Sequence, residues 1–184
     1  MARTPSTMVA LGTKAPGFTL PDTVSGKDIS IENIKGELAT MIMFICNHCP
    51  FVKHVNAELV RLANDHKNKG VGFVAISSND VINHPDDSPG LMTEVAKQLK
   101  YPFPYLYDDS QEVAKAFDAA CTPDFFIYDK DLQLVYRGQL DDSRPGNEIP
   151  VTGKDIRHAL DCLINKRPVP QGQRPSIGCN IKWK

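Results

Sequence analysis

The sequence contains no long apolar run. No stretch approaches the roughly 18 consecutive apolar residues of a membrane span, and the opening M-A-R-T-P-S-T-M-V-A-L-G has no apolar core of signal-peptide length. An excess of charge of one sign is also missing, because the formal net charge is −1. Such a balance gives no electrostatic reason to expect nucleic acid or an anionic membrane as a partner. We therefore expect a cytoplasmic protein that binds neither nucleic acid nor membrane.

A second pair of closely spaced cysteines is missing as well. The chain has five cysteines, of which only Cys46 and Cys49 are close in sequence, while Cys121, Cys162 and Cys179 are isolated. A structural zinc site takes four ligands, usually including a second such pair. We accordingly predict no metal and no other cofactor.

The length and composition fit one globular domain. A chain of 184 residues that is 41% hydrophobic and 23% charged can bury one substantial core. We place the domain at residues 8–166, with a loose segment at residues 1–7 and a tail rich in Pro and Gly at residues 167–184.

Apolar periodicity predicts strands that alternate with helices. The run Thr40–Ile45 indicates a buried strand, followed by an amphipathic helix that ends near Gly70 and is bent by Pro50. Further along the chain we predict a strand at 71–77, a helix at 89–99 capped by Ser88, an extended segment at 102–107, a helix at 111–119 capped by Ser110, a hairpin of strands 125–128 and 132–137, and a helix that runs from a capping box at Thr152 and Asp155 to Ile164.

The C-x-x-C turn between the first strand and its helix carries the predicted chemistry. Two cysteines at a helix start are close enough to form a disulfide, and the helix dipole favours a thiolate on the first of them. We predict that Cys46 is the nucleophile and that Cys49 resolves the mixed disulfide. Asn47 and His48 lie between them as supporting residues, and a charged His48 would favour the Cys46 thiolate.

The order of these elements, with Thr122-Pro123 directly before the hairpin, resembles the thioredoxin-like superfamily over Leu11 to Asn165. More closely, the chain resembles the alkyl hydroperoxide reductase and redoxin branch. The segments that carry this resemblance are G-T-K-A-P-G-F-T-L, C-N-H-C-P-F-V, C-T-P-D-F-F-I-Y-D and S-I-G-C-N-I-K-W.

The resemblance implies an α/β fold with a central mixed sheet flanked by helices. It also implies a cis Pro123 that faces the two cysteines, and a Thr122 backbone that pairs with a bound partner strand. The chain departs from thioredoxin in having I-C-N-H-C instead of W-C-G-P-C. It departs from the peroxiredoxin motif P-x3-T-x2-C because Met43 and Ala39 stand where the threonine and proline would be.

The remaining reactive residues leave alternatives open. Cys121 and Cys179 are candidate accessory redox residues. Cys121 is either a third redox thiol or a small residue packed beneath the loop. Cys179 either pairs with Cys121 or Cys46 during turnover, or lies packed in a tail that Ile181 and Trp183 anchor. Arg137 is expected to be exposed at a strand end, with peroxide polarisation as the alternative.

Three functions compete. The first is a thiol-disulfide oxidoreductase that acts on a disulfide-bearing protein or small molecule and is recycled by a thioredoxin or glutathione system. The second is a peroxiredoxin-like thiol peroxidase with Cys46 as the peroxidatic cysteine and a hydroperoxide as substrate. The third is a redox-regulated or metal-carrying binding module.

Overall fold

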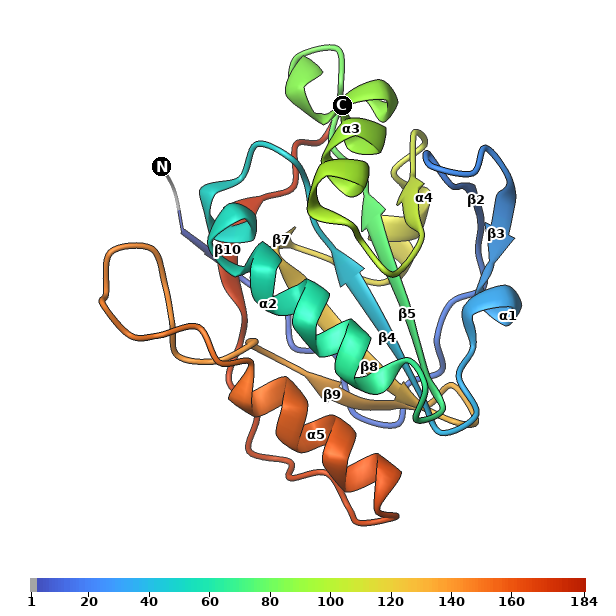
Figure 1. The fold of residues 1–184 in the computed structure, drawn as a ribbon, viewed down its shortest axis with the longest axis vertical. Helices are drawn as coiled ribbons and strands as arrows, with labels where there is room; N and C mark the ends of the chain where they lie inside the picture. Colours follow the sequence, from blue (N-terminus) through green and yellow to red (C-terminus); the bar gives the residue numbers. More distant parts are fainter. Residues whose placement is uncertain (1–2) are drawn as a thin grey trace.

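A computed structural model describes residues 3–184 and shows a central five-stranded sheet with strand order β6-β5-β4-β8-β9 (Figure 1). Strands β4, β5 and β6 are parallel, whereas β8 is antiparallel to both β4 and β9. This mixed sheet confirms the predicted thioredoxin-like α/β architecture. The strand bounds are Ala39–Phe44 (β4), Val71–Ser77 (β5), Tyr105–Tyr107 (β6), Asp124–Asp129 (β8) and Leu134–Arg137 (β9).

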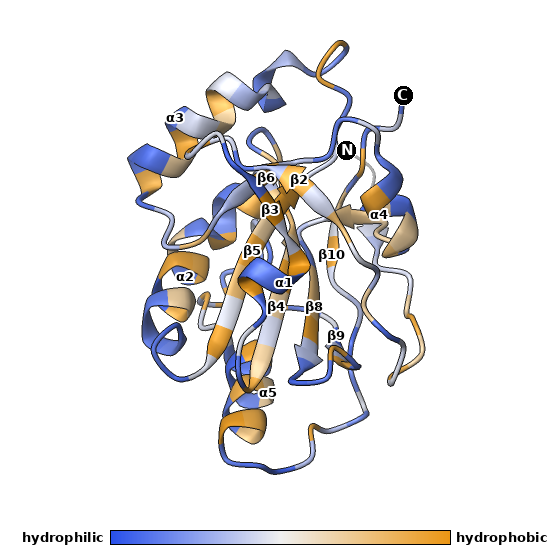
Figure 2. Ribbon diagram, turned by 90° about the vertical axis from the view of Figure 1, so that its right-hand side faces the viewer, coloured by the Kyte–Doolittle hydropathy of each residue, from blue (hydrophilic) through white to orange (hydrophobic). Residues whose placement is uncertain are grey.

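Helices cover both faces of this sheet, and α2 and α4 lie on opposite sides of it (Figure 2). Short strands β2 (Thr19–Pro21) and β3 (Asp28–Ser30) form a separate antiparallel hairpin. Among the described residues, no helix has the length and apolar character needed to cross a membrane. The helices are α1 (Ile31–Ile34), α2 (Pro50–His66), the 3-10 helix η1 (Pro85–Asp87), α3 (Pro89–Leu99), α4 (Glu112–Ala116) and α5 (Lys154–Ile164).

The central strand β4 is apolar on both faces because each face has its own core. Met41 and Met43 pack with residues of α2, α3 and α5, whereas Ile42 and Phe44 pack with residues of α1 and α4. Side chains alternate between the two faces of a strand. A strand covered on both faces is therefore a continuous apolar run, which is why this segment could be predicted from the sequence.

Both terminal segments join a second sheet, with strand order β1-β10-β7. Its strands are β1 (Thr4–Pro5), β10 (Ile177–Asn180) and β7 (Cys121–Thr122), and all pairings are antiparallel. The prediction of a loose segment at residues 1–7 is therefore wrong for residues 4–6, while residues 1 and 2 lie outside the described part. Ile181 is buried at 1% exposure and anchors the tail in the core, whereas Trp183 is 44% exposed and does not.

Several predicted helix starts differ from the observed ones. Pro50 is the first residue of α2 rather than an interior residue. A proline at this position fits a helix, so Pro50 gives no reason for the predicted bend in α2. Ser88 does precede α3. The residues that precede α4 and α5 are Gln111 and Gly153, both in the left-handed region, so the predicted caps at Ser110 and Thr152 are wrong. Backbone conformation and tertiary contacts, which local sequence patterns do not encode, set these two helix starts.

Candidate active site

The C-x-x-C turn lies between β4 and α2. Cys49 is the residue that caps α2, so Cys46 stands three residues before the cap and outside the first helical turn. Both side chains are buried, with exposures of 2% for Cys46 and 0% for Cys49. The turn therefore brings the two predicted redox cysteines together in a site that is closed to solvent.

Thr122, from the segment before the hairpin, contacts both cysteines. Its Oγ1 lies 3.4 Å from the Cys46 Sγ, and its carbonyl oxygen lies 3.1 Å from the Cys49 Sγ. The Thr122-Pro123 peptide bond is cis, as the resemblance implies. The predicted pairing of Thr122 with a partner strand is untested, but β10 already occupies this edge, with Cys179 opposite Thr122.

Asp87 organises the turn and was not singled out from the sequence. Its Oδ1 accepts hydrogen bonds from the backbone amides of Asn47 at 2.8 Å and His48 at 3.1 Å. Its Oδ2 lies 2.6 Å from His48 Nδ1 and accepts a bond from Asn79 Nδ2 at 2.7 Å. The two backbone amides that follow Cys46 therefore donate to a carboxylate. The only sequence signal was its position before the Ser88-Pro89 helix start.

These contacts set the charge of the turn. Burial opposes ionisation of Asp87, but its hydrogen bonds from His48 and Asn79 outweigh burial and lower its pKa. The same hydrogen bond and the charge of Asp87 raise the pKa of His48. His48 Nδ1 lies 4.0 Å from the Cys46 Sγ, and its ring stacks on that of His84 at a centroid distance of 5.5 Å. His48, predicted as a supporting residue, thus forms an ion pair with Asp87 beside Cys46.

The surroundings of the two cysteines move their pKa values in opposite directions. The interaction with Cys49, burial and the carboxylate of Asp87 raise the pKa of Cys46, whereas the interactions with Cys46 and Cys179 lower the pKa of Cys49 despite its burial. The Cys49 thiol donates to the Thr122 carbonyl oxygen at 3.1 Å, so this contact holds a proton on Cys49.

The other predicted residues occupy distinct places. Asn47 donates from its side chain to the Asp86 carbonyl oxygen and accepts a bond from the buried Tyr105 hydroxyl at 3.1 Å. Cys121 is fully buried, and its thiol donates to the Pro123 carbonyl oxygen at 3.6 Å. Cys179 is brought to the site, with its Sγ 3.0 Å from that of Cys49.

Arg137 is fully buried, so the prediction that it is exposed at a strand end is wrong. Its guanidinium forms an ion pair with Asp124 at 3.1 Å, donates to the Phe117 carbonyl oxygen and stacks 4.2 Å from the Phe126 ring centroid. These contacts hold Arg137 in the protein interior, and no contact with Cys46 is among them. The alternative in which Arg137 polarises a peroxide therefore loses its support.

Cys46, His48 and Asp87 offer three ligand atoms within 4.8 Å of one another, the arrangement in the described residues that could hold a metal. The four hydrogen bonds of Asp87 already occupy both of its oxygens. A metal would have to break the His48–Asp87 hydrogen bond to reach the Nδ1 lone pair. These side chains therefore bond to one another in an arrangement that does not fit a metal site.

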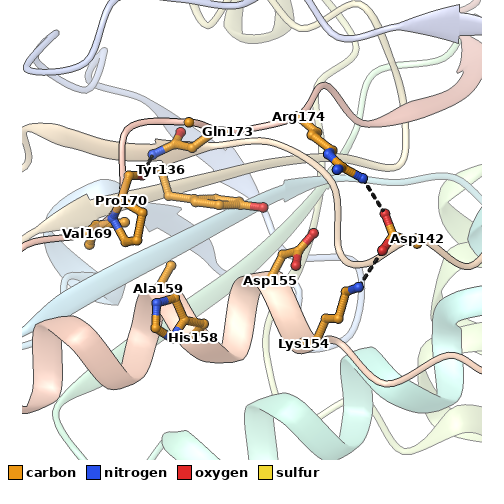
Figure 3. Close-up of a pocket in the computed structure, with 11 residues that line it drawn as sticks. Tyr136, Asp142, Lys154, Asp155, His158, Ala159, Val169, Pro170, Gln173 and Arg174 are labelled. Carbon is orange, nitrogen blue, oxygen red and sulfur yellow. Dashed lines mark hydrogen bonds and ion pairs between the residues drawn. The ribbon is translucent and has the colours of Figure 1, made fainter.

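A pocket of about 370 Å³ lies away from these thiols, between α5 and tail residues 169–174 (Figure 3). Tyr136 and His158 line it, and Asp142 at its rim forms ion pairs with Lys154 and Arg174. The pocket has no cysteine in its lining and contributes no group to the thiol site.

Comparisons with known proteins agree with this description. A family model, AhpC/TSA family, matches residues 11–137, whereas no curated protein matches the chain. An uncharacterized conserved protein from Geobacillus kaustophilus is 64% identical, with coverage of 100% of this chain and 97% of its own, and a TM-score of 0.99. A hypothetical protein from Sinorhizobium meliloti is 46% identical, with 98% coverage of both chains and a TM-score of 0.96.

A thiol:disulfide interchange protein of the thioredoxin family, from Chlorobium tepidum, shows the same fold at lower identity. It is 18% identical over 85% of this chain and 99% of its own, with a TM-score of 0.65. At this identity the similarity concerns the fold alone.

Proposed function

The chain belongs to the AhpC/TSA family, and this membership suggests thiol-based redox activity. We propose that the protein is a thiol-disulfide oxidoreductase that uses Cys46 and Cys49. The observation that carries this proposal is that Thr122 contacts both sulfurs, with its Oγ1 3.4 Å from the Cys46 Sγ and its carbonyl oxygen 3.1 Å from the Cys49 Sγ. Two sulfurs held in one buried cluster can form a disulfide with little movement of the chain.

The proposed reaction reduces or exchanges a disulfide in a protein or small molecule. Cys46 loses its proton and attacks one substrate sulfur, and the other substrate sulfur leaves as a thiolate that takes up this proton. Cys49 then attacks Cys46, its proton passes to the leaving thiolate, and the substrate departs with two thiols. A cellular dithiol or thiol, such as a thioredoxin or glutathione system, reduces the Cys46–Cys49 disulfide again.

A thiol peroxidase is the second candidate, and one contact favours it. The Thr122 hydroxyl, 3.4 Å from the Cys46 Sγ, could orient a peroxide although the threonine of the peroxiredoxin motif is replaced by Met43. Arg137 weighs against this function, because its guanidinium is held by Asp124 and Phe126. The oxidoreductase is therefore the function that the site supports best.

A paired oxidant challenge tests the proposal. Fully reduced protein is exposed to hydrogen peroxide or to an oxidised dithiol, the rates are followed, and the disulfides are mapped by peptide mass spectrometry. We expect rapid exchange with the dithiol to give Cys46–Cys49, and a peroxide rate no greater than that of an ordinary thiolate.

Two variants calibrate the rates. Cys46→Ser should abolish exchange, whereas Cys162→Ser, which removes a buried thiol on α5, should leave it unchanged. Rapid peroxide consumption that depends on Cys46, with slow dithiol exchange, would establish the peroxidase instead. Failure of both oxidants to form Cys46–Cys49 would refute the proposed oxidoreductase.

A further inference from the structure

The tail strand β10 is seated closely on β7. Cys179 lies opposite Thr122 in the antiparallel pairing, and Asn180 lies opposite Cys121. Gly178 permits this approach, because a Cβ at this residue would lie 2.0 Å from the Thr122 carbonyl oxygen. The Ser176 hydroxyl also donates to the Pro123 carbonyl oxygen at 2.7 Å. The tail is thus fixed on the segment that contacts both redox cysteines.

This seating places the Cys179 sulfur against the Cys49 sulfur. The two Sγ atoms are 3.0 Å apart, about 1 Å more than the roughly 2.05 Å of a disulfide bond. Both side chains are buried, with exposures of 3% for Cys179 and 0% for Cys49. A small displacement of either side chain would bring them to bonding distance.

We propose that Cys179 is a third redox thiol, which exchanges with the Cys46–Cys49 disulfide to form Cys49–Cys179. This inference rests on the proposed function, which supplies the first disulfide. In the step, the Cys179 sulfur loses its proton and attacks the Cys49 sulfur. The Cys46–Cys49 bond breaks, and Cys46 leaves with the electron pair and takes up the proton. One disulfide replaces another, so no external oxidant or reductant is consumed.

The exchange gives the oxidised protein two forms with different reactivity. In one form Cys46 is blocked in the disulfide with Cys49. In the other, the oxidising equivalents are held by Cys49–Cys179, while Cys46 is a thiol again. The second form also attaches the tail covalently to α2, whose capping residue is Cys49. Exchange with Cys179 thereby determines whether Cys46 of an oxidised molecule is a free thiol that can attack a substrate.

Cys179 suits this step better than the other two cysteines outside the C-x-x-C. Cys121 directs its thiol to the Pro123 carbonyl oxygen at 3.6 Å. Cys162 lies on α5, 3.8 Å from the His158 Nε2. The short sulfur-to-sulfur distance to Cys49 belongs to Cys179.

The test uses the full chain with Cys46→Ser, because this variant removes the competing disulfide. The protein is oxidised with oxidised dithiothreitol and quenched by alkylation, and its disulfides are mapped by peptide mass spectrometry. We expect Cys49–Cys179 to form in this variant. It should form equally in Cys46→Ser/Cys162→Ser, and no disulfide at Cys49 should form in Cys46→Ser/Cys179→Ser.

A matched pair of glycine variants tests the seating of the strand. Gly178→Ala places a methyl group against the Thr122 carbonyl oxygen, whereas Gly172→Ala, in the same tail, has nothing within 4 Å of its Cβ. On the Cys46→Ser background, Gly178→Ala should lower the rate of Cys49–Cys179 formation by about tenfold or more, because the effective concentration of a loosened tail cysteine falls. Gly172→Ala should leave this rate unchanged.

The outcomes separate this inference from the proposed function. If wild-type protein forms Cys46–Cys49 and turns over, but Cys46→Ser forms no Cys49–Cys179, the third thiol is refuted and the oxidoreductase stands. Equal rates for the two glycine variants would also overturn the inference, because the strand would then not be what presents Cys179. Formation of Cys49–Cys179 in a protein without turnover would support the exchange site and refute the oxidoreductase.

Discussion

Asp87 and Asp124 are both completely buried aspartates beside a cationic side chain, yet their pKa values move in opposite directions. Hydrogen bonds to Asp87 outweigh burial and lower its pKa. Burial raises the pKa of Asp124 to about 6, despite the opposing charge of Arg137. The same residue type therefore loses its proton more readily beside the C-x-x-C turn and holds it more tightly beside Arg137.

The two carboxylates also differ in how their oxygens are hydrogen-bonded. Asp87 accepts four bonds, from two backbone amides, His48 and Asn79. Asp124 accepts bonds on Oδ2 from Arg137 and the Ala120 amide, but its Oδ1 has no partner within the described part of the chain. A buried charge is stable only where donors replace the lost water. All four bonds at Asp87 hold the C-x-x-C turn, whereas one buried oxygen of Asp124 has no donor among the described residues.

The largest expected effect comes from the arginine. Arg137→Met leaves the Asp124 carboxylate buried without its partner and should lower the free energy of unfolding by about 3–5 kcal/mol. The loss should be smaller at pH 5 than at pH 8, because an unpaired Asp124 can then take up a proton. Urea unfolding at both pH values measures this change.

The exposed pair of Lys115 and Glu112 provides the control for that experiment. Lys115→Met should have little measurable effect on unfolding, since surface ion pairs contribute little. A loss for Arg137→Met no greater than that for Lys115→Met would show that the buried pair does not stabilise the fold.

An intermediate effect is expected for Asp87→Asn. The amide keeps one oxygen for the two backbone donors but presents an N–H group to His48 and Asn79, so stability should fall by about 1–3 kcal/mol. The pKa of His48 should fall as well, because its charged partner is gone. Urea unfolding and NMR titration of the His48 ring protons measure the two changes, with Asp86→Asn as the control. An unchanged His48 pKa would contradict the assigned pair.

The smallest effect is the pH dependence of the His48–Asp87 pair. The pKa of folded His48 is raised above the unfolded value of about 6.5, so its stabilisation is complete below about pH 6.5 and is lost as pH rises through the folded pKa. Asp87 has a lowered pKa, so its contribution is present above about pH 3.9 and disappears only as pH falls through its folded pKa. The pair therefore stabilises the fold most between about pH 4 and pH 6.5.

The pH dependence of this ion pair can be measured by comparing wild-type protein with the variant His48→Gln. The stability of wild-type protein relative to His48→Gln should decline on going from pH 6 to pH 9, by about 1 kcal/mol or less because His48 is partly exposed. Thermal or urea unfolding across that range measures the difference. A difference that grows with pH would mean that His48 is neutral in the folded protein.

Local sequence was sufficient for the parts of the fold that local forces determine. The double-sided apolar run of β4, the strand β5 and the start of α3 after Ser88 all follow the predicted ranges closely. The C-x-x-C and Thr122-Pro123 stand in short motifs, and the structure brings them together. These features need only patterning, turn chemistry and the order of the elements.

Long-range contacts explain what sequence patterns missed. Asp87 is 39 residues from His48, in a polar segment that looks like an ordinary exposed loop. Arg137 contacts the Phe117 carbonyl oxygen and the Phe126 ring, which belong to other segments of the chain, so its burial could not be predicted from a strand end. Cys179 was a candidate accessory residue, but its placement beside Cys49 depends on the β10–β7 register, which a Pro- and Gly-rich tail does not reveal.

The sheet order β1-β10-β7 also has a practical consequence for handling the protein. Thr4 and Pro5 pair with Gly178 and Ile177, and the Ser6 amide donates to the Ser176 carbonyl oxygen at 2.8 Å. Proteolytic trimming or an affinity tag at the start of the chain would therefore disturb the strand that carries Cys179, although neither touches a cysteine. Preparations that differ only in their first residues should be compared by thiol titration before their redox behaviour is attributed to the cysteines themselves.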